Sequence, residues 1–99
     1  MRSSMLDTIC AKCDDVHRLV RKHKGRSVYV FGSCARREET PESDIDFLVD
    51  FAPGATLFTM SGLQDGLQSL FNRPVDLITE KSLKHDSFGR RVLAERVAI

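Results

Sequence analysis

Two aspartates separated by a single residue, Asp44 and Asp46, are the side chains whose types and spacing best suit chemistry. They begin the segment 44–51, where side chains alternate as they do along a strand, so both carboxylates point to one face. Their backbone positions are then about 7 Å apart, which allows both side chains to reach one or two divalent cations. The pair therefore predicts a metal site, with a solvated strand edge as the simpler alternative.

A second candidate is the dipeptide Gly32-Ser33, which directly follows the β-branched and aromatic run 27–31. Glycine permits a tight turn and the close approach of a ligand, and the backbone N–H groups after it are expected to begin a short helix. Such a turn suits phosphate groups, and the Ser33 hydroxyl can donate a further hydrogen bond. Together the two patterns predict phosphate chemistry beside a metal site.

These residues need strands and helices to hold them, and the hydrophobic periodicity of the chain indicates where those elements lie. Apolar residues recur at helical spacing from Leu6 to Val20, after a capping-box pattern formed by Ser4 and Asp7. The connection 34–43 is rich in arginine and glutamate and contains a proline. We expect it to be a short helical turn followed by a loop.

Asn72 stands where a helix over 57–71 must end, and asparagine tolerates the left-handed conformation of a helix terminator. The expected order is α-β-β-α-β-α, which gives a small mixed sheet flanked by helices in the α/β (α+β) class. The expected elements are a helix over 6–20, strands over 27–31 and 44–51, a helix over 57–71, a strand over 74–79 and a helix over 86–96.

The 99 residues, 1–99, are expected to form a single domain, because the chain is too short for a second hydrophobic core. The formal net charge is +1 and the basic residues are scattered, so we do not expect direct nucleic-acid binding. No apolar signal segment follows Met1, and no stretch approaches the ~20 apolar residues that cross a bilayer. We therefore expect a cytoplasmic protein without a membrane partner.

Cys10 and Cys13 form a C-x-x-C pair, a pattern found in metal sites and redox centres. No second cysteine or histidine pair follows at zinc spacing, and both cysteines fall on the apolar stripe of the first expected helix. We therefore expect two small buried side chains in a helix.

The spacing of the two candidate motifs resembles that of a known family. Gly32-Ser33, ten intervening residues and Asp44-Ile45-Asp46 resemble the signature of the DNA polymerase beta-like nucleotidyltransferase superfamily. Segments 31–36 and 43–46 resemble its minimal nucleotidyltransferase (MNT) branch, and 73–77 resembles the strand that carries the third carboxylate of that branch. The resemblance covers nearly the whole chain and implies a polymerase beta-like nucleotidyltransferase fold.

The same resemblance implies a two-metal mechanism with magnesium. Asp44 and Asp46 would bridge two Mg²⁺ ions, and Asp76 would complete the site of the ion that activates the attacking hydroxyl. Arg37 stands where family members often carry glycine. The nucleotide-binding residues that the resemblance implies are Gly32, Ser33 and Arg36.

A reaction and a partner are implied as well. MNT proteins of HEPN–MNT toxin–antitoxin pairs transfer AMP from ATP to a tyrosine hydroxyl of the HEPN toxin. We therefore expect an antitoxin-type protein adenylyltransferase with ATP as substrate and a HEPN toxin as partner. Two alternatives stay open: a non-catalytic module that neutralises the same partner, and nucleotidyl transfer to a small molecule such as an aminoglycoside.

The apolar tail, 92–99, has two interpretations that the sequence does not separate: it covers the core of this chain, or it lies in a partner interface. So short a chain with a partly open sheet gains from association. We expect a hetero-oligomer with the target, and self-association is the alternative.

Overall fold

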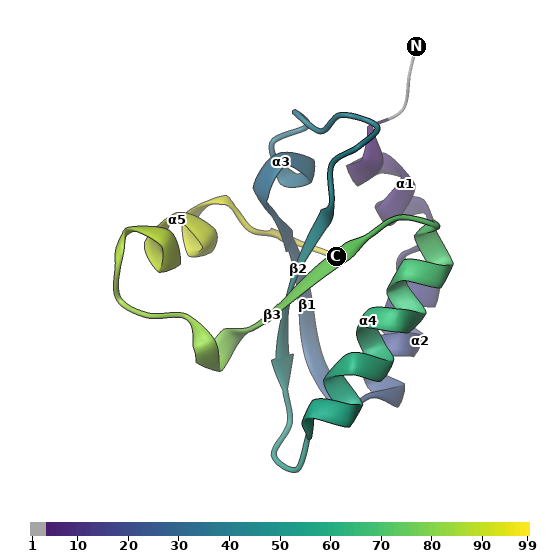
Figure 1. The fold of residues 1–99 in the computed structure, drawn as a ribbon, viewed down its shortest axis with the longest axis vertical. Coiled ribbons are helices and arrows are strands. Elements are labelled where there is room, and N and C mark those ends of the chain that lie inside the picture. Colours follow the sequence, from purple (N-terminus) through teal and green to yellow (C-terminus); the bar gives the residue numbers. More distant parts are fainter. Residues whose placement is uncertain (1–3) are drawn as a thin grey trace.

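The computed structural model describes residues 4–99, which form one mixed sheet with helices on both faces (Figure 1). This architecture confirms the predicted fold class. In chain order the elements are α1 (Met5–Ala11), α2 (Cys13–Lys22), β1 (Gly25–Phe31), α3 (Gly32–Ala35), β2 (Ile45–Phe51), α4 (Leu57–Phe71), β3 (Val75–Thr79), the 3-10 helix η1 (Glu80–Ser82), α5 (Ser87–Glu95) and β4 (Val97–Ala98).

The strands of the sheet lie in the order β3-β2-β1-β4. β1 runs antiparallel to both β2 and β4, whereas β2 and β3 are parallel. A parallel pair needs a crossover connection, and α4 provides it. The crossover places β3, and the acidic residue it carries, directly beside β2.

Helices α1, α2 and α4 cover one face of the sheet, and α5 covers part of the other (Figure 1). Alternate residues of β2, among them Ile45 and Phe47, point into the main core beneath the first three helices, as the alternation of the sequence predicts. A smaller cluster of Phe31, Leu48 and Val92 holds α5 against the opposite face. That second face also carries the acidic residues of β2.

Two predicted helix ends are confirmed. Ser4 and Asp7 form a capping box, in which the Asp7 N–H donates to the Ser4 hydroxyl and the Ser4 N–H donates to the Asp7 carboxylate, both at 3.2 Å. Asn72 ends α4 in the left-handed conformation, with φ 52° and ψ 42°. Within residues 4–99, no helix has both the length and the apolar character that a membrane span requires.

The left-handed conformation of Asn72 leads to a stability prediction. Asn72→Ala is expected to lower the free energy of unfolding by about 1 kcal/mol, because the Cβ of alanine disfavours this conformation. Asn72→Gly is expected to leave that free energy equal or higher, because glycine adopts it without strain. Urea denaturation of the three proteins measures the difference. Equal stability of the two variants would contradict this account of the helix end.

The predicted helix 6–20 is wrong in one respect, because it is two helices with a break at Lys12, whose φ of −106° and ψ of 20° are not helical. The break lets α1 contact α3 while α2 packs against β1. The prediction that Cys10 and Cys13 are buried is also wrong, because Cys10 is exposed and Cys13 is only half-buried. The apolar periodicity continues across Lys12 and does not reveal the break.

The sequence analysis also missed β4, which pairs with Tyr29 and Val30 of β1. A strand of two residues is too short to show alternation. Val97 and Ile99 pack against the main core, so this part of the apolar tail covers the chain's own core. The large apolar side chains of α5 that stay at the surface are Phe88, 54% exposed, and Leu93, 46% exposed.

Candidate active site

The pairing register of the sheet brings the predicted site residues to one place. Phe31 is opposite Asp46 in the β1–β2 pair, and Asp46 is opposite Asp76 in the β2–β3 pair. Gly32 follows Phe31 at the end of β1, and Asp44 stands one residue before β2. The predicted phosphate-binding turn and the carboxylates therefore occupy three adjacent strands, which lie about 4.8 Å apart.

Asp46 is the most enclosed of the three acids, being half-buried where Asp44 and Asp76 are exposed. Burial disfavours its charged form, and this effect, followed by the nearby carboxylates of Asp76 and Asp44, raises the pKa of Asp46 from 3.8 to about 6. Arg36 lowers the same pKa. The arrangement is an acidic cluster in which a bound cation would relieve the mutual repulsion.

Magnesium fits the donor set of this cluster. Within residues 4–99, no three His, Cys, Asp or Glu side chains are close enough together to hold a metal ion as they stand. Three like charges are expected to spread apart, and the exposed side chains of Asp44 and Asp76 rotate readily. All the donors are carboxylate oxygens, which Mg²⁺ prefers. Rotation of these exposed side chains would be needed for all three carboxylates to reach one ion.

Gly32 lies against the carboxylate of Asp46. Its φ is +72°, a value that side chains other than glycine rarely adopt, and a Cβ built on Gly32 would collide with Oδ2 of Asp46. Ser33 follows it, half-buried at the start of α3. Because Gly32 has no side chain, the backbone of the turn and the Asp46 carboxylate face one small volume. A Cβ would fill part of that volume.

Arg36, the predicted phosphate contact, is held by two glutamates. Its Nε–H donates to Glu38 over 3.1 Å, and its Nη1–H donates to Glu95 of α5 over 2.8 Å. Both hydrogen bonds raise the pKa of the guanidinium, which is already positive at any ordinary pH. Ion pairs as exposed as these are weak, so a phosphate group can compete for the guanidinium.

Sequence reasoning missed Arg73, which fixes the approach to Asp44. Its Nη2–H groups donate to the carbonyl oxygens of Thr40 at 2.6 Å and Ser43 at 2.7 Å. Those carbonyls belong to the loop directly before Asp44, and Arg73 itself precedes the strand that carries Asp76. One guanidinium therefore links the segments that position two of the three carboxylates. The sequence gives no sign of this link apart from the place of Arg73 in the segment 73–77.

We expect Arg73→Ala to lower the free energy of unfolding by about 1–2 kcal/mol, because two carbonyls lose a charged donor. The rate of the expected nucleotidyl transfer should fall as well, because the loop before Asp44 loses its support. Arg73→Lys should restore only part of the stability and part of the rate, since an ammonium group lacks the forked donors of the guanidinium. Arg18→Ala is the control: Arg18 is 75% exposed and pairs weakly with Asp15. Wild-type stability and turnover in Arg73→Ala would show that the loop holds its position without this residue.

Three neighbouring residues have other roles. Asp50 pairs with Arg26 at 3.3 Å. Cys34 is buried, and burial raises the pKa of its thiol to about 11, so it stays protonated and unreactive. Arg37 has a φ of 59°, a conformation that glycine adopts more readily, and its guanidinium binds Asp7 rather than the site.

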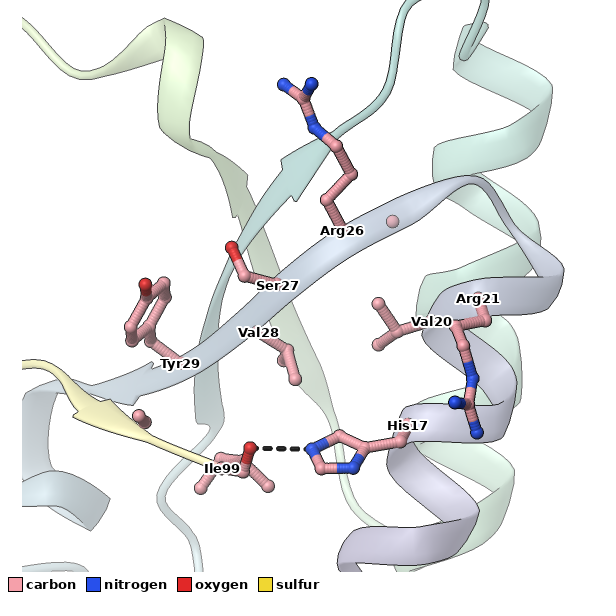
Figure 2. Close-up of a pocket in the computed structure, with 10 residues that line it drawn as sticks. His17, Val20, Arg21, Arg26, Ser27, Val28, Tyr29 and Ile99 are labelled. Carbon is pink, nitrogen blue, oxygen red and sulfur yellow. Dashed lines mark hydrogen bonds between the residues drawn. The ribbon is translucent and has the colours of Figure 1, made fainter.

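A separate cavity of about 310 Å³ lies at the other end of β1, between that strand, α2 and β4 (Figure 2). Val20 and Val28 line it, and Nε2 of His17 lies 2.6 Å from the carbonyl oxygen of Ile99 at one side. None of the predicted site residues lines this cavity. It is therefore not part of the acidic cluster.

Comparison with known proteins agrees with this fold. Residues 16–99 match the family model of the nucleotidyltransferase domain, and the chain belongs to that family. Protein adenylyltransferase MntA of Thermococcus cleftensis is 38% identical over 74 residues, which are 75% of this chain and 74% of the relative. A solved structure described as a "putative minimal nucleotidyltransferase" superimposes with a TM-score of 0.84 at 35% identity, over 95% of both chains. Within the family this protein is a minimal nucleotidyltransferase domain that resembles MntA-type antitoxins.

A more distant match extends the comparison of folds. It is a chain of the solved complex described as tri-AMPylated Shewanella oneidensis HEPN toxin with MNT antitoxin, with a TM-score of 0.64 at 23% identity, over 86% of this chain and 66% of that chain. At that identity the likeness shows a shared fold alone.

Proposed function

We propose that this chain is an antitoxin-type protein adenylyltransferase, which transfers AMP from ATP to a tyrosine hydroxyl of a HEPN-type toxin. The observation that carries the proposal is the alignment of Phe31, Asp46 and Asp76 across three adjacent strands, with Gly32 directly after Phe31 and Asp44 directly before β2. A relative named protein adenylyltransferase supports the reaction. The choice of partner follows a solved HEPN–MNT complex, one chain of which shares the fold of this protein.

Asp44, Asp46 and Asp76 would hold two Mg²⁺ ions. When bound, these ions neutralise charge on the phosphates and lower the pKa of the attacking hydroxyl. The position of Asp46, half-buried between two other acids, suits a cation better than a proton at neutral pH.

The turn after β1 would receive the leaving part of the nucleotide. Backbone N–H groups at Gly32 and Ser33 and the Ser33 hydroxyl would donate to the β- and γ-phosphates. Arg36 would exchange Glu95 for a phosphate oxygen, a charge-assisted contact of the same kind. In the transfer, the acceptor oxygen bonds to the α-phosphorus and the bond from that phosphorus to the bridging oxygen breaks. Pyrophosphate leaves with the electron pair, and the acceptor proton passes to water.

Intact-mass spectrometry tests the reaction. The protein is incubated with ATP, Mg²⁺ and the product of the neighbouring gene, tested as the HEPN protein, beside an Asp44→Asn/Asp46→Asn double variant. We expect the HEPN protein to gain one or more adenylyl masses with the wild-type chain and none with the variant. A stable complex that neutralises the toxin without any gain of mass, or with equal potency in the variant, would instead indicate a binding module.

A further inference from the structure

The order of the strands assigns sides to the reaction. The proposed phosphate-binding turn follows β1, Asp46 lies on β2, and Asp76 lies on β3. In phosphoryl transfer the attacking oxygen and the leaving oxygen lie roughly in line on opposite sides of the phosphorus. If pyrophosphate leaves toward β1, the acceptor hydroxyl approaches from the side of β3.

A cavity of about 360 Å³ lies on that side, between β3, η1 and α5. Ile78, one of its lining residues, is two positions after Asp76 on the same strand, so the two side chains share a face about 7 Å apart. Leu83 and Phe88 form the other apolar walls. Phe88 also packs edge-on against Phe31, with 6.4 Å between the ring centroids. Phe31 is the residue opposite Asp46 in the β1–β2 pair. None of the three acids lines this cavity, but Ile78 and Phe88 connect it to the residues beside Asp76 and Asp46.

Three polar residues line this cavity, namely Ser82, Lys84 and Asp86, and two of them form hydrogen bonds within the chain. Ser82 donates its hydroxyl hydrogen to the Thr79 carbonyl at 2.8 Å, and the Asp86 carboxylate accepts from the Gly89 N–H at 2.8 Å. What the cavity offers a ligand is therefore chiefly apolar surface, including an aromatic ring that is 54% exposed. Its volume lies at the lower end of the range for ligand pockets, which suits one ring rather than a whole nucleoside.

We infer that this cavity receives the aromatic side chain of the acceptor, a tyrosine of the partner protein, and directs its hydroxyl toward Asp76 and Asp46. The inference rests on the proposed function, which supplies the transfer reaction. The nucleoside is a poorer occupant. Its ribose is joined to the α-phosphorus through an oxygen that is neither the attacking nor the leaving oxygen, so the nucleoside does not lie on the line that joins those two oxygens. The rings of Phe88 and the tyrosine would stack or meet edge-to-face, which favours an aromatic acceptor over serine or threonine.

N-acetyltyrosinamide is the probe for binding, with N-acetylserinamide as its control. We expect the first compound to shift the NMR signals of Ile78, Leu83 and Phe88 in the wild-type protein, and the second to leave them unchanged. Phe88→Ala should abolish those shifts. Because this measurement needs no AMP transfer, it separates the binding of the acceptor from the proposed reaction. Binding of the probe without any AMP transfer would support the cavity as the acceptor site and reject the proposed function.

Transfer kinetics with the same probe as acceptor give the second readout. Phe88→Ala and Leu83→Ala should each lower kcat/KM for N-acetyltyrosinamide about 10-fold, with the affinity for a non-hydrolysable ATP analogue within about twofold of wild type. Phe58→Ala is the matched control, because Phe58 is 91% exposed and belongs to α4 rather than to this cavity.

Two outcomes would overturn the inference. An equal loss of affinity for the ATP analogue in Phe88→Ala would assign the cavity to the nucleobase. Unchanged acceptor kinetics in both cavity variants would show that the acceptor binds elsewhere, and AMP transfer would still stand. Because Phe88 contacts Phe31, the amide spectrum of each variant is recorded first, and Leu83→Ala provides the test if Phe88→Ala is unfolded.

Discussion

Replacing Asp46 with asparagine is expected to abolish nucleotidyl transfer while making the metal-free protein more stable. The loss of activity follows from the position of Asp46 between Asp76 on the neighbouring strand and the turn at Gly32. A neutral amide is a poor ligand for Mg²⁺ and cannot offset the charge that the ion brings. Losing several kcal/mol of charge stabilisation in the transition state corresponds to about a 10³-fold decrease in kcat/KM.

The gain in stability follows from the raised pKa of Asp46. Well below pH 3.8 the carboxyl is protonated in both the folded and the unfolded chain and has no effect on stability. Between pH 4 and pH 6 the unfolded chain loses the proton first, since the folded pKa is about 6, so the free energy of unfolding falls as the pH rises. Because Asp46 is only half-buried, solvent screening reduces the penalty, and we expect about 1 kcal/mol above pH 7. Asparagine has no such penalty.

Urea denaturation in EDTA at pH 4 and pH 8 measures this effect, with Asp50→Asn as the matched control. Asp50 lies on the same face of the same strand but pairs with Arg26, so its variant should keep full activity and gain no stability at pH 8. Added Mg²⁺ should stabilise the wild-type protein and the Asp50 variant more than the Asp46 variant. Equal stability of the wild-type protein and Asp46→Asn at pH 8, or residual activity within tenfold of wild type, would contradict the assigned role of Asp46.

Gly32→Ala is expected to impair both folding and nucleotide binding. The positive φ of Gly32 alone gives about 1–2 kcal/mol of strain with alanine. The new Cβ would also collide with Oδ2 of Asp46, so the carboxylate must rotate away from the volume that it shares with the turn. We expect a total loss of stability of about 2–3 kcal/mol and at least a 10-fold weaker affinity for ATP in the presence of Mg²⁺.

A second glycine separates the two effects of this substitution. Gly54 has a φ of +96°, but a Cβ there meets only Lys24 Nζ, at 3.7 Å. Gly54→Ala should therefore show the loss of stability that comes from strain, while its affinity for ATP stays at the wild-type value. Isothermal titration with a non-hydrolysable ATP analogue compares the two variants. If Gly32→Ala bound the analogue as tightly as Gly54→Ala, the turn would not be a nucleotide site.

The parts of the site that depend on local patterns were predictable from the sequence. Alternation along 44–51 places Asp44 and Asp46 on one face, and the structure confirms this alternation with buried Ile45 and Phe47 on the other. The place of Asp76 came from resemblance to a family, and the parallel register opposite Asp46 agrees with it. The metal and nucleotide roles of these residues remain predictions.

Features that depend on distant segments could not be predicted in this way. Arg73 acts through carbonyls 30 and 33 positions earlier in the chain, and carbonyls leave no trace in the sequence. The two-residue strand β4 exists only because β1 offers an open edge for pairing. The ion pair of Arg36 with Glu95 likewise joins α3 to α5. The sequence analysis predicted a phosphate contact for Arg36 but could not predict that Glu95 binds its guanidinium.

The position of β2 within the sheet also has a consequence for protein synthesis. Asp46 has its neighbours on strands that precede and follow it, and β3 is made only after the whole of α4. A nascent chain on the ribosome therefore has no complete acidic cluster until residue 79 has left the exit tunnel. Fragments that end before Val75 lack Asp76 and are expected not to transfer AMP, so interrupted translation of this message would release no active enzyme.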